Sequence, residues 1–407
     1  MTHNSTKIYI LADDLTGALD SGVQLSKKGD QVLITLDTHR PFEKIDGADV
    51  LVIDTETRHI EAKAAYQKVY ELIRQAKESG IKKIYKKTDS GLRGNVGAEL
   101  TAFLDAYEAE KIDFVPAWPK MQRITVNGVH YVNGVPLSES IFSRDVVDPV
   151  SESEIEKLIR RQSNAAISHH ETNKEEKGIV IYDCQSDEEL EEIAGKLFAP
   201  EKESFLLAGC AGLLEKFPDK KIDQNNSSVQ LNPKLVVLSG SMNDVTKAQL
   251  EKAQKDGAYR VHIPMQKVAC DSWKEEEIAS FATDFLKKAS GDIAIIDTMD
   301  SFEEVNITRG SLSFQIAWYM GLLCEKLIDQ GMDATLMIIG GDTLLGVVNQ
   351  LDITTLRPIR EMESGIVLSA YQRQDVEGYI ITKSGGFGSE ALLKKIQENL
   401  KEDSVCH

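Results

Sequence analysis

The sequence predicts an α/β protein built from two three-layer domains, each with a largely parallel sheet, and a cleft between them. Short apolar runs alternate with amphipathic stretches almost from end to end, which is the pattern of strand–helix units. The chain has 407 residues, and single cores stop growing at roughly 250 to 300 residues. Residues 217–234 are polar, rich in turn formers and without periodicity. We therefore expect one domain over residues 1–228 and a second over residues 229–407.

The first half contains seven expected strands and one clear helix. The strands are predicted at residues 7–12, 31–36, 50–54, 83–86, 112–115, 178–182 and 205–208. The helix is predicted over residues 61–77, because apolar residues recur there at spacings of three and four. Within residues 116–148, Asn127-Gly128 and Asn133-Gly134 are turn signals that frame Val-His-Tyr-Val. They predict a hairpin or flap that can cover a ligand or bridge subunits, which is consistent with a homodimer.

The second half repeats the strand–helix pattern. Strands are predicted at residues 235–238, 259–263, 292–296, 335–339 and 379–382. Three of them end in glycine-rich corners, which are Ser239-Gly240-Ser241, Gly340-Gly341-Asp342-Thr343 and Ser384-Gly385-Gly386-Phe387-Gly388. Glycine lets backbone approach a phosphate, and free N–H groups at a helix start supply donors. One such corner is usually an ordinary turn, whereas three in one domain predict a nucleotide-phosphate site. The sequence has neither GxxxxGK[ST] nor a GxGxxG after the first strand.

The overall composition excludes several classes of protein. The hydrophobic content of 42% and charged content of 28% are those of an ordinary globular protein. A net charge of -18 argues against nucleic-acid and membrane-surface partners, whose binding depends on basic patches. The five cysteines form no CxxC pair, so we interpret them as reduced thiols. No apolar run approaches the ~20 residues of a membrane span, and no signal-peptide core is evident. We expect a cytoplasmic protein.

The segment Tyr85–Asn95 is the most informative part of the chain. It gathers Lys86, Lys87 and Arg93 around Thr88-Asp89-Ser90, so its local charge opposes that of the whole protein. An arginine fork can hold a carboxylate through two parallel N–H bonds, a lysine adds a mobile charge, and Asp89 can accept from a hydroxyl. The expected ligand is a polyhydroxy acid.

Two further candidates follow predicted strands. Asp13 and Asp14 come directly after the first strand, and ligands of open α/β sheets bind at the carboxyl ends of strands. A carboxylate there can act as general base, orient a hydroxyl or hold a metal, and the alternative is a helix cap. We assign the functional role to Asp14 and a structural one to Asp13. Arg58 follows the third strand, where it contacts either a substrate carboxylate or only solvent.

Together, the Asp13–Gly17 corner, the Lys86–Asn95 turn, the Gly340–Thr343 corner and Lys383–Gly388 resemble the four-carbon acid sugar kinases, and the likeness spans nearly the whole chain. The turn is most similar to that of the D-threonate kinases, Lys-Lys-x-Asp-Ser-x-x-Arg-Gly-Asn. Three features depart from the family pattern: Gly91 replaces a common hydroxyl residue, Cys210 replaces a usual serine, and Gln122 and Ile124 interrupt Gly-Arg-Thr around Arg123. We expect Gly91 to mark an altered substrate preference.

The resemblance implies an acid-sugar domain over residues 1–228 and a nucleotide-binding domain over residues 229–407. It implies transfer of a phosphoryl group from ATP, with Mg²⁺, to the C4 hydroxyl of D-threonate; D-erythronate and 3-oxo-tetronate are the alternative substrates. Asp14, Arg58 and Lys87–Ser90 match substrate positions, whereas Ser241, Gly340–Thr343 and Gly386 match nucleotide positions.

On the expected mechanism, Arg58 and Lys87 hold the carboxylate, Asp89 and Ser90 form hydrogen bonds with the hydroxyls, and Asp14 accepts or orients the proton of the attacking hydroxyl. Arg93 orders the turn. The sequence identifies no metal ligand, although Asp342 is a candidate by location. Two alternatives from other classes are a hydroxy-acid dehydrogenase, which the missing dinucleotide fingerprint disfavours, and a non-catalytic sugar-acid sensor, which the three glycine corners disfavour.

Overall fold

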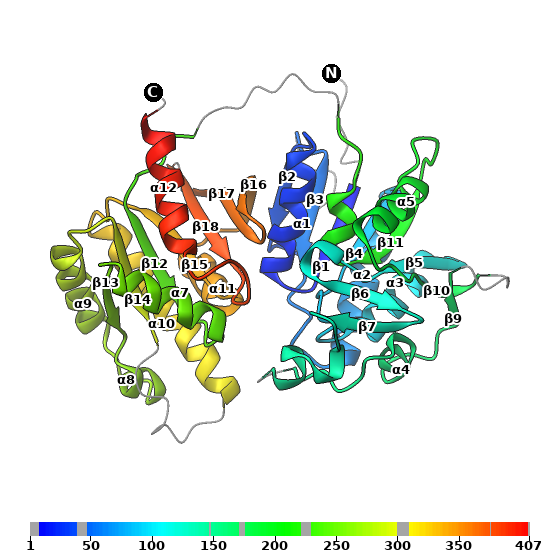
Figure 1. Cartoon of the computed structure of the whole chain (residues 1–407), viewed down its shortest axis with the longest axis horizontal. Coiled ribbons are helices and arrows are strands. Elements are labelled where there is room, and N and C mark those ends of the chain that lie inside the picture. The colour runs from blue at the N-terminus through cyan, green and yellow to red at the C-terminus, as the bar shows by residue number, and fades with distance from the viewer. Residues whose placement is uncertain are drawn as a thin grey trace. The chain divides into compact units, whose positions relative to one another are not determined.

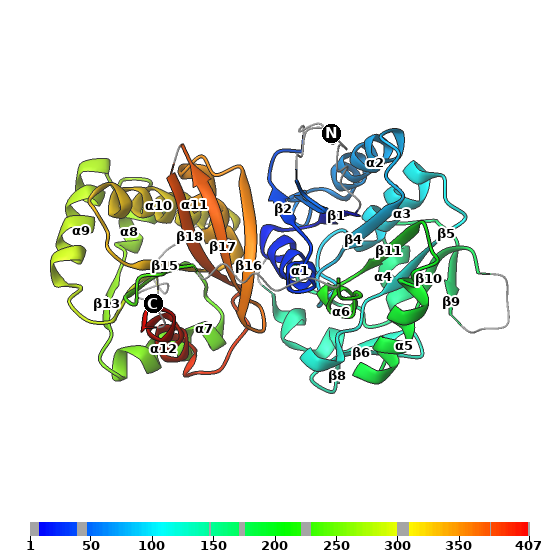
Figure 2. The same cartoon turned by 90° about the horizontal axis from the view of Figure 1, so that it is seen from above.

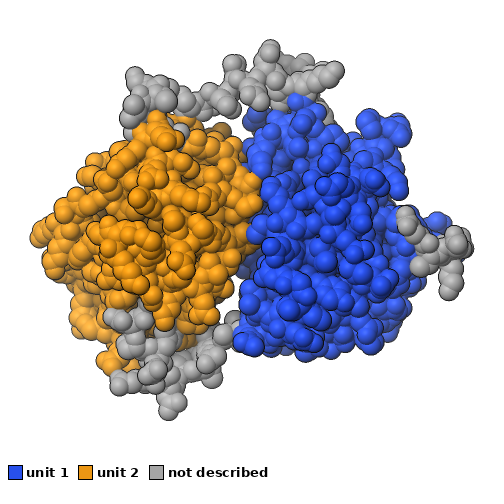
Figure 3. Space-filling model, in the orientation of Figure 1, with its two compact units in different colours: residues 1–222 blue, residues 223–407 orange. Residues whose placement is uncertain are grey.

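The computed structural model describes residues 8–38, 47–145, 148–170, 176–220, 229–298, 309–374 and 376–405. The chain forms two compact units, residues 1–222 and residues 223–407 (Figure 3). The division falls inside the predicted linker, of which residues 221–228 lie outside the described residues. The domain boundary at residue 228 and the cleft stay predictions.

Unit 1 is an α/β unit whose eight main strands are all parallel (Figure 1). Its elements are β1 Ile8–Ala12, α1 Leu15–Lys27, β2 Val32–Thr35, β3 Val50–Asp54, α2 Ala62–Glu78, β4 Lys83–Lys87, α3 Val96–Tyr107, β5 Lys111–Val115, α4 Ile155–Arg160, β9 Ile167–His169, β10 Gly178–Ile181, α5 Asp187–Leu197, β11 Phe205–Gly209 and α6 Ala211–Glu215. The strand order is β2-β3-β1-β4-β11-β5-β10-β9. The seven predicted strands and the predicted helix are confirmed, whereas the three-residue strand β9 was not predicted.

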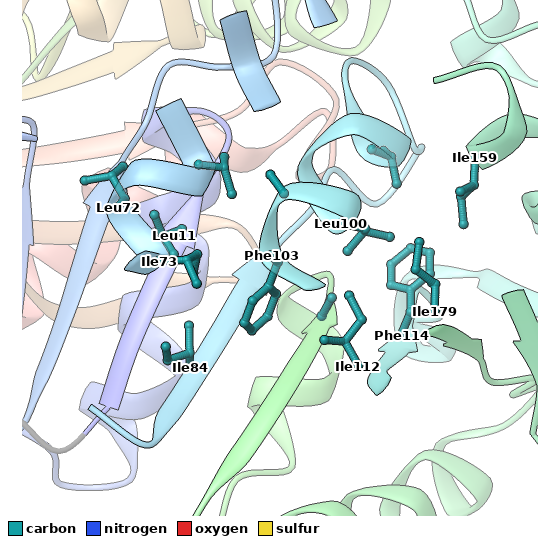
Figure 4. Packing of buried hydrophobic residues seen from close by; sticks show 14 of the residues in the cluster. Leu11, Leu72, Ile73, Ile84, Leu100, Phe103, Ile112, Phe114, Ile159 and Ile179 are labelled. Carbon is teal, nitrogen blue, oxygen red and sulfur yellow. The ribbon is translucent and has the colours of Figure 1, made fainter. Parts of the chain in front are cut away.

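The core of unit 1 lies between the sheet and helices α2 and α3. Figure 4 shows this packing. Alternate strand residues point to this side, and the apolar stripes of both helices cover them. The labelled side chains are Leu11, Leu72, Ile73, Ile84, Leu100, Phe103, Ile112, Phe114, Ile159 and Ile179. Helices α1 and α6 lie on the opposite side of the sheet (Figure 2), so the predicted three-layer architecture is confirmed for this unit.

The topology of unit 1 determines where a ligand can bind. From β1 the chain passes through α1 to β2 on one side, and from β3 it passes through α2 to β4 on the other side of β1. The connections that leave β1 and β4 therefore diverge. Open α/β sheets bind ligands at such a switch point, outside the carboxyl ends of the strands.

The predicted flap is confirmed as a small antiparallel sheet. It consists of β6 Arg123–Val126, β7 Val129–Val132 and β8 Val135–Pro136. Its turns lie at the two predicted Asn-Gly pairs, where both residues of each pair have positive φ, from 51° to 80°. Asn and Gly tolerate this left-handed conformation best, which explains why the sequence signal was reliable here.

Unit 2 has a mixed sheet in the order β13-β14-β12-β15-β18-β17-β16. Its elements are β12 Leu235–Ser239, α7 Asp244–Lys255, β13 Tyr259–His262, α8 Met265–Ala269, α9 Glu275–Lys288, β14 Ile293–Asp297, α10 Arg309–Asp329, β15 Thr335–Ile339, α11 Gly341–Gln350, β16 Thr355–Glu363, β17 Ile366–Arg373, β18 Val376–Lys383 and α12 Leu392–Val405. The five predicted strands are confirmed. The antiparallel strands β16 and β17 were not predicted, because β16 carries a proline and two register shifts that break its alternation.

Helix α11 begins at the Gly341 corner and packs backbone to backbone against α10. A Cβ at Gly346 would lie 2.0 Å from the carbonyl oxygen of Ala317, and one at Gly321 would lie 2.3 Å from that of Gly346. These two glycines therefore fix how closely the helix that carries the corner approaches its neighbour.

We expect Gly346→Ala to lower the free energy of unfolding by about 1–3 kcal/mol, because the helices must separate to admit a methyl group. Denaturant unfolding of the full chain measures this. Gly195→Ala on α5 is the matched control, because nothing lies within 4 Å of its added Cβ, and it should stabilise by up to about 1 kcal/mol through helix propensity. Equal stability of Gly346→Ala and the wild type would contradict the close contact.

Candidate active site

Asp14 is the first group at the carboxyl edge of unit 1, and it is also the cap of α1. Its Oδ1 accepts from the Gly17 amide at 2.8 Å, and its Oδ2 accepts from the Thr16 hydroxyl at 2.7 Å. The register places Ala12 of β1 beside Asp54 of β3 and Lys87 of β4. The Asp14 carboxylate is therefore a helix cap, and the same carboxylate is the candidate for the functional role. The capping hydrogen bonds hold it in a fixed orientation.

Arg58 connects the two aspartates after β1 to the turn after β4. Its Nε donates to Asp13 at 2.7 Å and its Nη1 donates to Asp14 at 2.6 Å. Its Nη2 lies 3.8 Å from Asp89, beyond hydrogen-bond length. Burial would raise the pKa of Asp13, but Arg58 and Lys86 outweigh burial and hold the pKa below its ordinary value. The guanidinium, only 7% exposed, is thus fixed by carboxylates and keeps one nitrogen outside these bonds.

Asp89 and Arg93 form the second ion pair of the edge. Arg93 donates through Nε and Nη2 to the two carboxylate oxygens of Asp89 at 2.8 and 2.9 Å, and through Nη1 to Asp145 at 2.9 Å. Burial would raise the pKa of Asp89, but Arg93 and Arg58 hold it well below its usual value. Asp89 is therefore an ionised acceptor, and Arg93 orders the turn around it, as expected from the sequence.

The two lysines of the turn face different surroundings. Lys86 is fully buried, and its ammonium lies 3.0 Å from Glu99 of α3. Lys87 donates to the carbonyl oxygen of Thr88 at 2.8 Å. A Cβ at Gly17 would lie 3.0 Å from the Lys87 nitrogen and 2.6 Å from Asp14 Oδ1. Lys87 therefore lies beside Asp14, whereas Lys86 is paired with Glu99 in the core.

The flap contacts the same turn through a histidine. His130 of β7 shares hydrogen bonds with the carbonyl oxygen of Ser90 and with the hydroxyl of Thr125, both at 3.1 Å. Burial lowers the pKa of His130 to about 4, so the ring is neutral at physiological pH. It fixes the backbone of Ser90 beneath the flap and adds no charge.

Arg123 is a further candidate for the site, to which the sequence analysis assigned no role. Its guanidinium lies 5.5 Å from the centre of the Phe142 ring, and that of Arg93 lies 5.1 Å from the same ring. Among the described residues its Nε is buried without a hydrogen-bond partner, and burial lowers its pKa although Asp89 opposes this. An arginine with an unfilled donor beside Asp89 fits a site for an anion. The sequence around residue 123 has no charge pattern that indicates an anion site, because Arg123 approaches the turn only when the flap is folded against it.

Gly91 also lies against Phe142. A Cβ at this position would lie 2.7 Å from the phenyl ring. From the sequence, we expect Gly91 to alter the substrate preference. The structure adds a packing reason for the glycine, because any side chain must displace the ring that Arg93 and Arg123 share.

Asp54 and Glu56 are further acidic residues that the sequence reasoning left out. Asp54 ends β3, is 2% exposed, and leaves its Oδ2 without a hydrogen-bond partner in the described chain. Burial, with Glu56 and Asp14 adding to it, raises the pKa of Asp54 well above its usual value. This pair therefore favours a proton. Across the described residues, no group of three or more His, Cys, Asp or Glu side chains could hold a metal ion.

The three glycine corners of unit 2 meet at the ends of the neighbouring strands β12, β15 and β18. The Gly240 amide donates to the Thr343 hydroxyl at 3.1 Å, and a Cβ on Gly240 would lie 2.4 Å from that oxygen. A Cβ on Gly385 would lie 2.7 Å from the Ser241 hydroxyl. In the strand order, the connection from β12 leads to β13 in one direction and the connection from β15 leads to β16 in the opposite direction. This edge of the sheet is therefore also a switch point. The corners lie close together because their glycines have no side chains.

Fold and geometry define a two-domain α/β protein with a fixed set of cations and carboxylates in one unit and convergent phosphate-type corners in the other. Residues 8–217 match the model of the sugar-binding N-terminal domain, and residues 236–393 match that of the nucleotide-binding C-terminal domain. The chain belongs to the four-carbon acid sugar kinase family, and it is an enzyme.

The similarity between this chain and the following kinases extends over nearly the whole length of both sequences. The chain is 31% identical to a D-threonate kinase of Salmonella typhimurium, covering 95% of this chain and 96% of that protein. It is 26% identical to a D-threonate kinase of Bordetella bronchiseptica, with coverage of 97% and 98%. It is 25% identical to a 3-oxo-tetronate kinase of Methylobacterium radiotolerans, with coverage of 94% and 97%.

A solved structure of a Salmonella typhimurium LT2 protein has the same fold, with a TM-score of 0.77 at 20% identity, covering 97% of this chain and 99% of that one. Within the described residues, no helix is long and apolar enough to span a membrane.

We expect Gly91→Thr to lower the free energy of unfolding by about 1–3 kcal/mol, because its side chain displaces Phe142 from Arg93 and Arg123. Denaturant unfolding of Gly91→Thr, Phe142→Ala and the double variant forms a cycle. The double variant should lose less than the sum of the single losses, since removal of the phenyl ring leaves room for the threonine. Strict additivity would show that the two positions are not in contact.

Proposed function

We propose that the chain catalyses the ATP- and Mg²⁺-dependent phosphorylation of the C4 hydroxyl of D-threonate, giving 4-phospho-D-threonate and ADP. The observation that carries this proposal is the edge of unit 1, where Arg58, Lys87 and Asp89 are fixed together at the topological switch point. Similarity to proteins named D-threonate kinase supports the choice of acid. D-erythronate and 3-oxo-tetronate are the alternatives, and they are supported by similarity to proteins named D-erythronate kinase and 3-oxo-tetronate kinase.

Substrate binding follows from which donors and acceptors remain open. We propose that Arg58 Nη2 and the Lys87 ammonium hold the carboxylate, with Arg123 of the flap as a third cation. Asp89, whose pKa is held low, accepts from a substrate hydroxyl, while Thr88 and Ser90 contribute their own hydroxyls. The Thr88 hydroxyl is buried without a partner within the described chain, as expected for a group that awaits a ligand.

Phosphoryl transfer needs positioning and charge neutralisation more than covalent chemistry. The bond from the substrate C4 oxygen to the γ-phosphorus forms as the bond from that phosphorus to the bridging oxygen of ADP breaks. The hydroxyl proton passes to Asp14, whose carboxylate is held by Thr16, Gly17 and Arg58. These contacts fix Asp14 in one orientation before the substrate arrives.

The nucleotide belongs to unit 2 in this proposal. Ser239, Gly240, Ser241, Gly340, Gly341, Asp342, Thr343, Gly385 and Gly386 are the residues proposed to bind it. Bound Mg²⁺ would neutralise phosphate charge, and Asp342, exposed at the start of α11, suits an ion that uses one or two carboxylates besides phosphate oxygens. A cytoplasmic location and a homodimer belong to the same proposal; they rest on composition and on the flap.

We expect a coupled ADP-release assay to rank D-threonate above D-erythronate and 3-oxo-tetronate by at least about tenfold in kcat/KM, because hydrogen bonds to substrate hydroxyls discriminate strongly. A higher kcat/KM for either other acid would select that alternative. Absence of ADP release with all three acids, together with no thermal shift from ATP, would show that the proposed reaction is wrong.

We expect Asp14→Asn to lower kcat by about 10²- to 10⁴-fold with little change in KM, because the amide cannot take the proton. Asparagine caps helices as well as aspartate does, but it removes a carboxylate charge from buried Arg58, so we expect this variant to lose up to about 3–5 kcal/mol of unfolding free energy. The assay is therefore run at a temperature at which denaturant unfolding shows the variant to be folded. A kcat within about threefold of the wild type would exclude Asp14 as the proton acceptor.

A further inference from the structure

Lys383 lies directly before the third glycine corner and is not among the residues proposed to bind the nucleotide. It ends β18, and its side chain is 1% exposed. Its ammonium donates to the carbonyl oxygens of Gly385 at 2.8 Å and Ser384 at 3.1 Å, and to the Thr246 hydroxyl at 3.2 Å. An ammonium has three donors, so these three oxygens satisfy it. The lysine thereby ties the corner to helix α7.

The charge of Lys383 is not balanced by the surrounding protein. Its register neighbours are Ile339 on β15 and Ile366 on β17, and Thr246 and Gln249 face the corner from α7. None of these side chains ionises. Burial lowers the pKa of Lys383 to about 7, and no charged group acts on it among the described residues.

The acidic residues of this edge do not supply the missing charge. Asp244 and Asp342, at the starts of α7 and α11, are exposed, and neither forms an ion pair with Lys383 in the described chain. Asp297, at the carboxyl end of β14, is already bound by Arg260 at 2.7 Å and by His262.

Unit 1 contains a buried lysine whose charge is balanced by an ion-pair partner. Lys86 is also buried, one residue before the end of β4, but Glu99 lies 3.0 Å from its nitrogen. A buried cation normally has such a partner, because an unpaired charge in the interior is costly. The difference at Lys383 is that the partner is missing where three corners of phosphate-binding type converge.

We propose that Lys383 is the charge-balancing residue of the phosphate site, so that a bound nucleotide supplies the missing negative charge and its binding takes up one proton from solution. The proposal rests on the nucleotide role of the corners. Neutral lysine plus a solvent proton gives the ammonium form, and no other bond changes. Since the ammonium contacts the corner's carbonyl groups, Lys383 acts as a positioning residue that stabilises the loaded site through its charge.

The direction of the pH dependence follows from linkage. The free protein binds this proton with a pKa of about 7, and a nearby phosphate raises the pKa in the complex. Below the free pKa the lysine is already charged, and binding takes up nothing. Between the free and bound values, uptake approaches one proton and nucleotide affinity falls up to about tenfold for each pH unit.

Calorimetric titration of the full chain with ADP at about pH 8.5, in buffers of different ionisation enthalpy, counts the protons taken up; most of the free lysine is then neutral. We expect uptake close to one proton with ADP and none with adenosine, which has no phosphate. Lys383→Gln should bind ADP more weakly and without uptake. Subtracting the proton uptake measured with Lys383→Gln from that of the wild type also removes any proton that ADP or another residue, such as His262, takes up on binding.

Binding of ADP to the wild type without proton uptake, or with the same uptake in Lys383→Gln, would overturn the proposal. Failure of ADP to bind at all would instead refute the nucleotide role of the corners. Should Lys383→Gln not fold, Lys383→Arg replaces it, because a guanidinium keeps its charge throughout this range and ADP should then bind without uptake.

Discussion

The ion pairs of the buried Arg58 guanidinium are the interactions on which the proposed acid-sugar site depends. The guanidinium bonds to Asp13 and Asp14 after β1 and approaches Asp89 after β4, so one side chain sets the distance between the ends of separate strands. Removing one partner from a buried ion network costs about 3–5 kcal/mol, because the remaining charges stay uncompensated. The network therefore fixes the geometry of the edge more than it adds net stability. A carboxylate that binds there meets donors whose directions are already set.

The same logic explains why a protein with a net charge of -18 can bind an anion at a turn crowded with its own carboxylates. Each carboxylate orients a guanidinium: Asp13 and Asp14 orient Arg58, and Asp89 orients Arg93. Global charge is screened within about 10 Å at moderate salt, so only the local arrangement acts on the ligand. Arg123 differs from these two, since its Nε has no partner in the described chain. The flap thus brings a less compensated cation to an edge that is otherwise internally neutralised.

A structural feature could be predicted from the sequence where it depends on a pattern that spans only a few neighbouring residues. The strands and the Asn-Gly turns were predicted because apolar runs and positive φ values leave marks within a few residues. Asp14, Lys87 and Asp89 could be named as candidates because they lie at the end of a strand or within two residues after it. Strand β16 was missed because its irregular pairing hides the alternation. The roles proposed for Arg123 and Lys383 could not be read from the sequence. They depend on a missing hydrogen bond at Arg123 Nε and a missing ion pair at Lys383, which are visible only once the strands and the flap have come together.

The two units differ electrostatically at switch points that have a similar strand order, β2-β3-β1-β4 in unit 1 and β13-β14-β12-β15 in unit 2. In unit 1 the charged groups at the switch point are paired and fixed, and on the proposed function a substrate binds to the donors that they leave open, such as Arg58 Nη2 and the Thr88 hydroxyl. Selectivity then comes from geometry. In unit 2 the corners offer backbone donors, with one buried lysine behind them that has no ion-pair partner in the described chain. On the proposed function, selectivity for phosphate comes from this charge. A sugar acid is distinguished from its stereoisomers by the direction of single hydroxyls, whereas a nucleotide is distinguished by its phosphates. Fixed dipoles and ion pairs suit the first task, and an uncompensated cation suits the second.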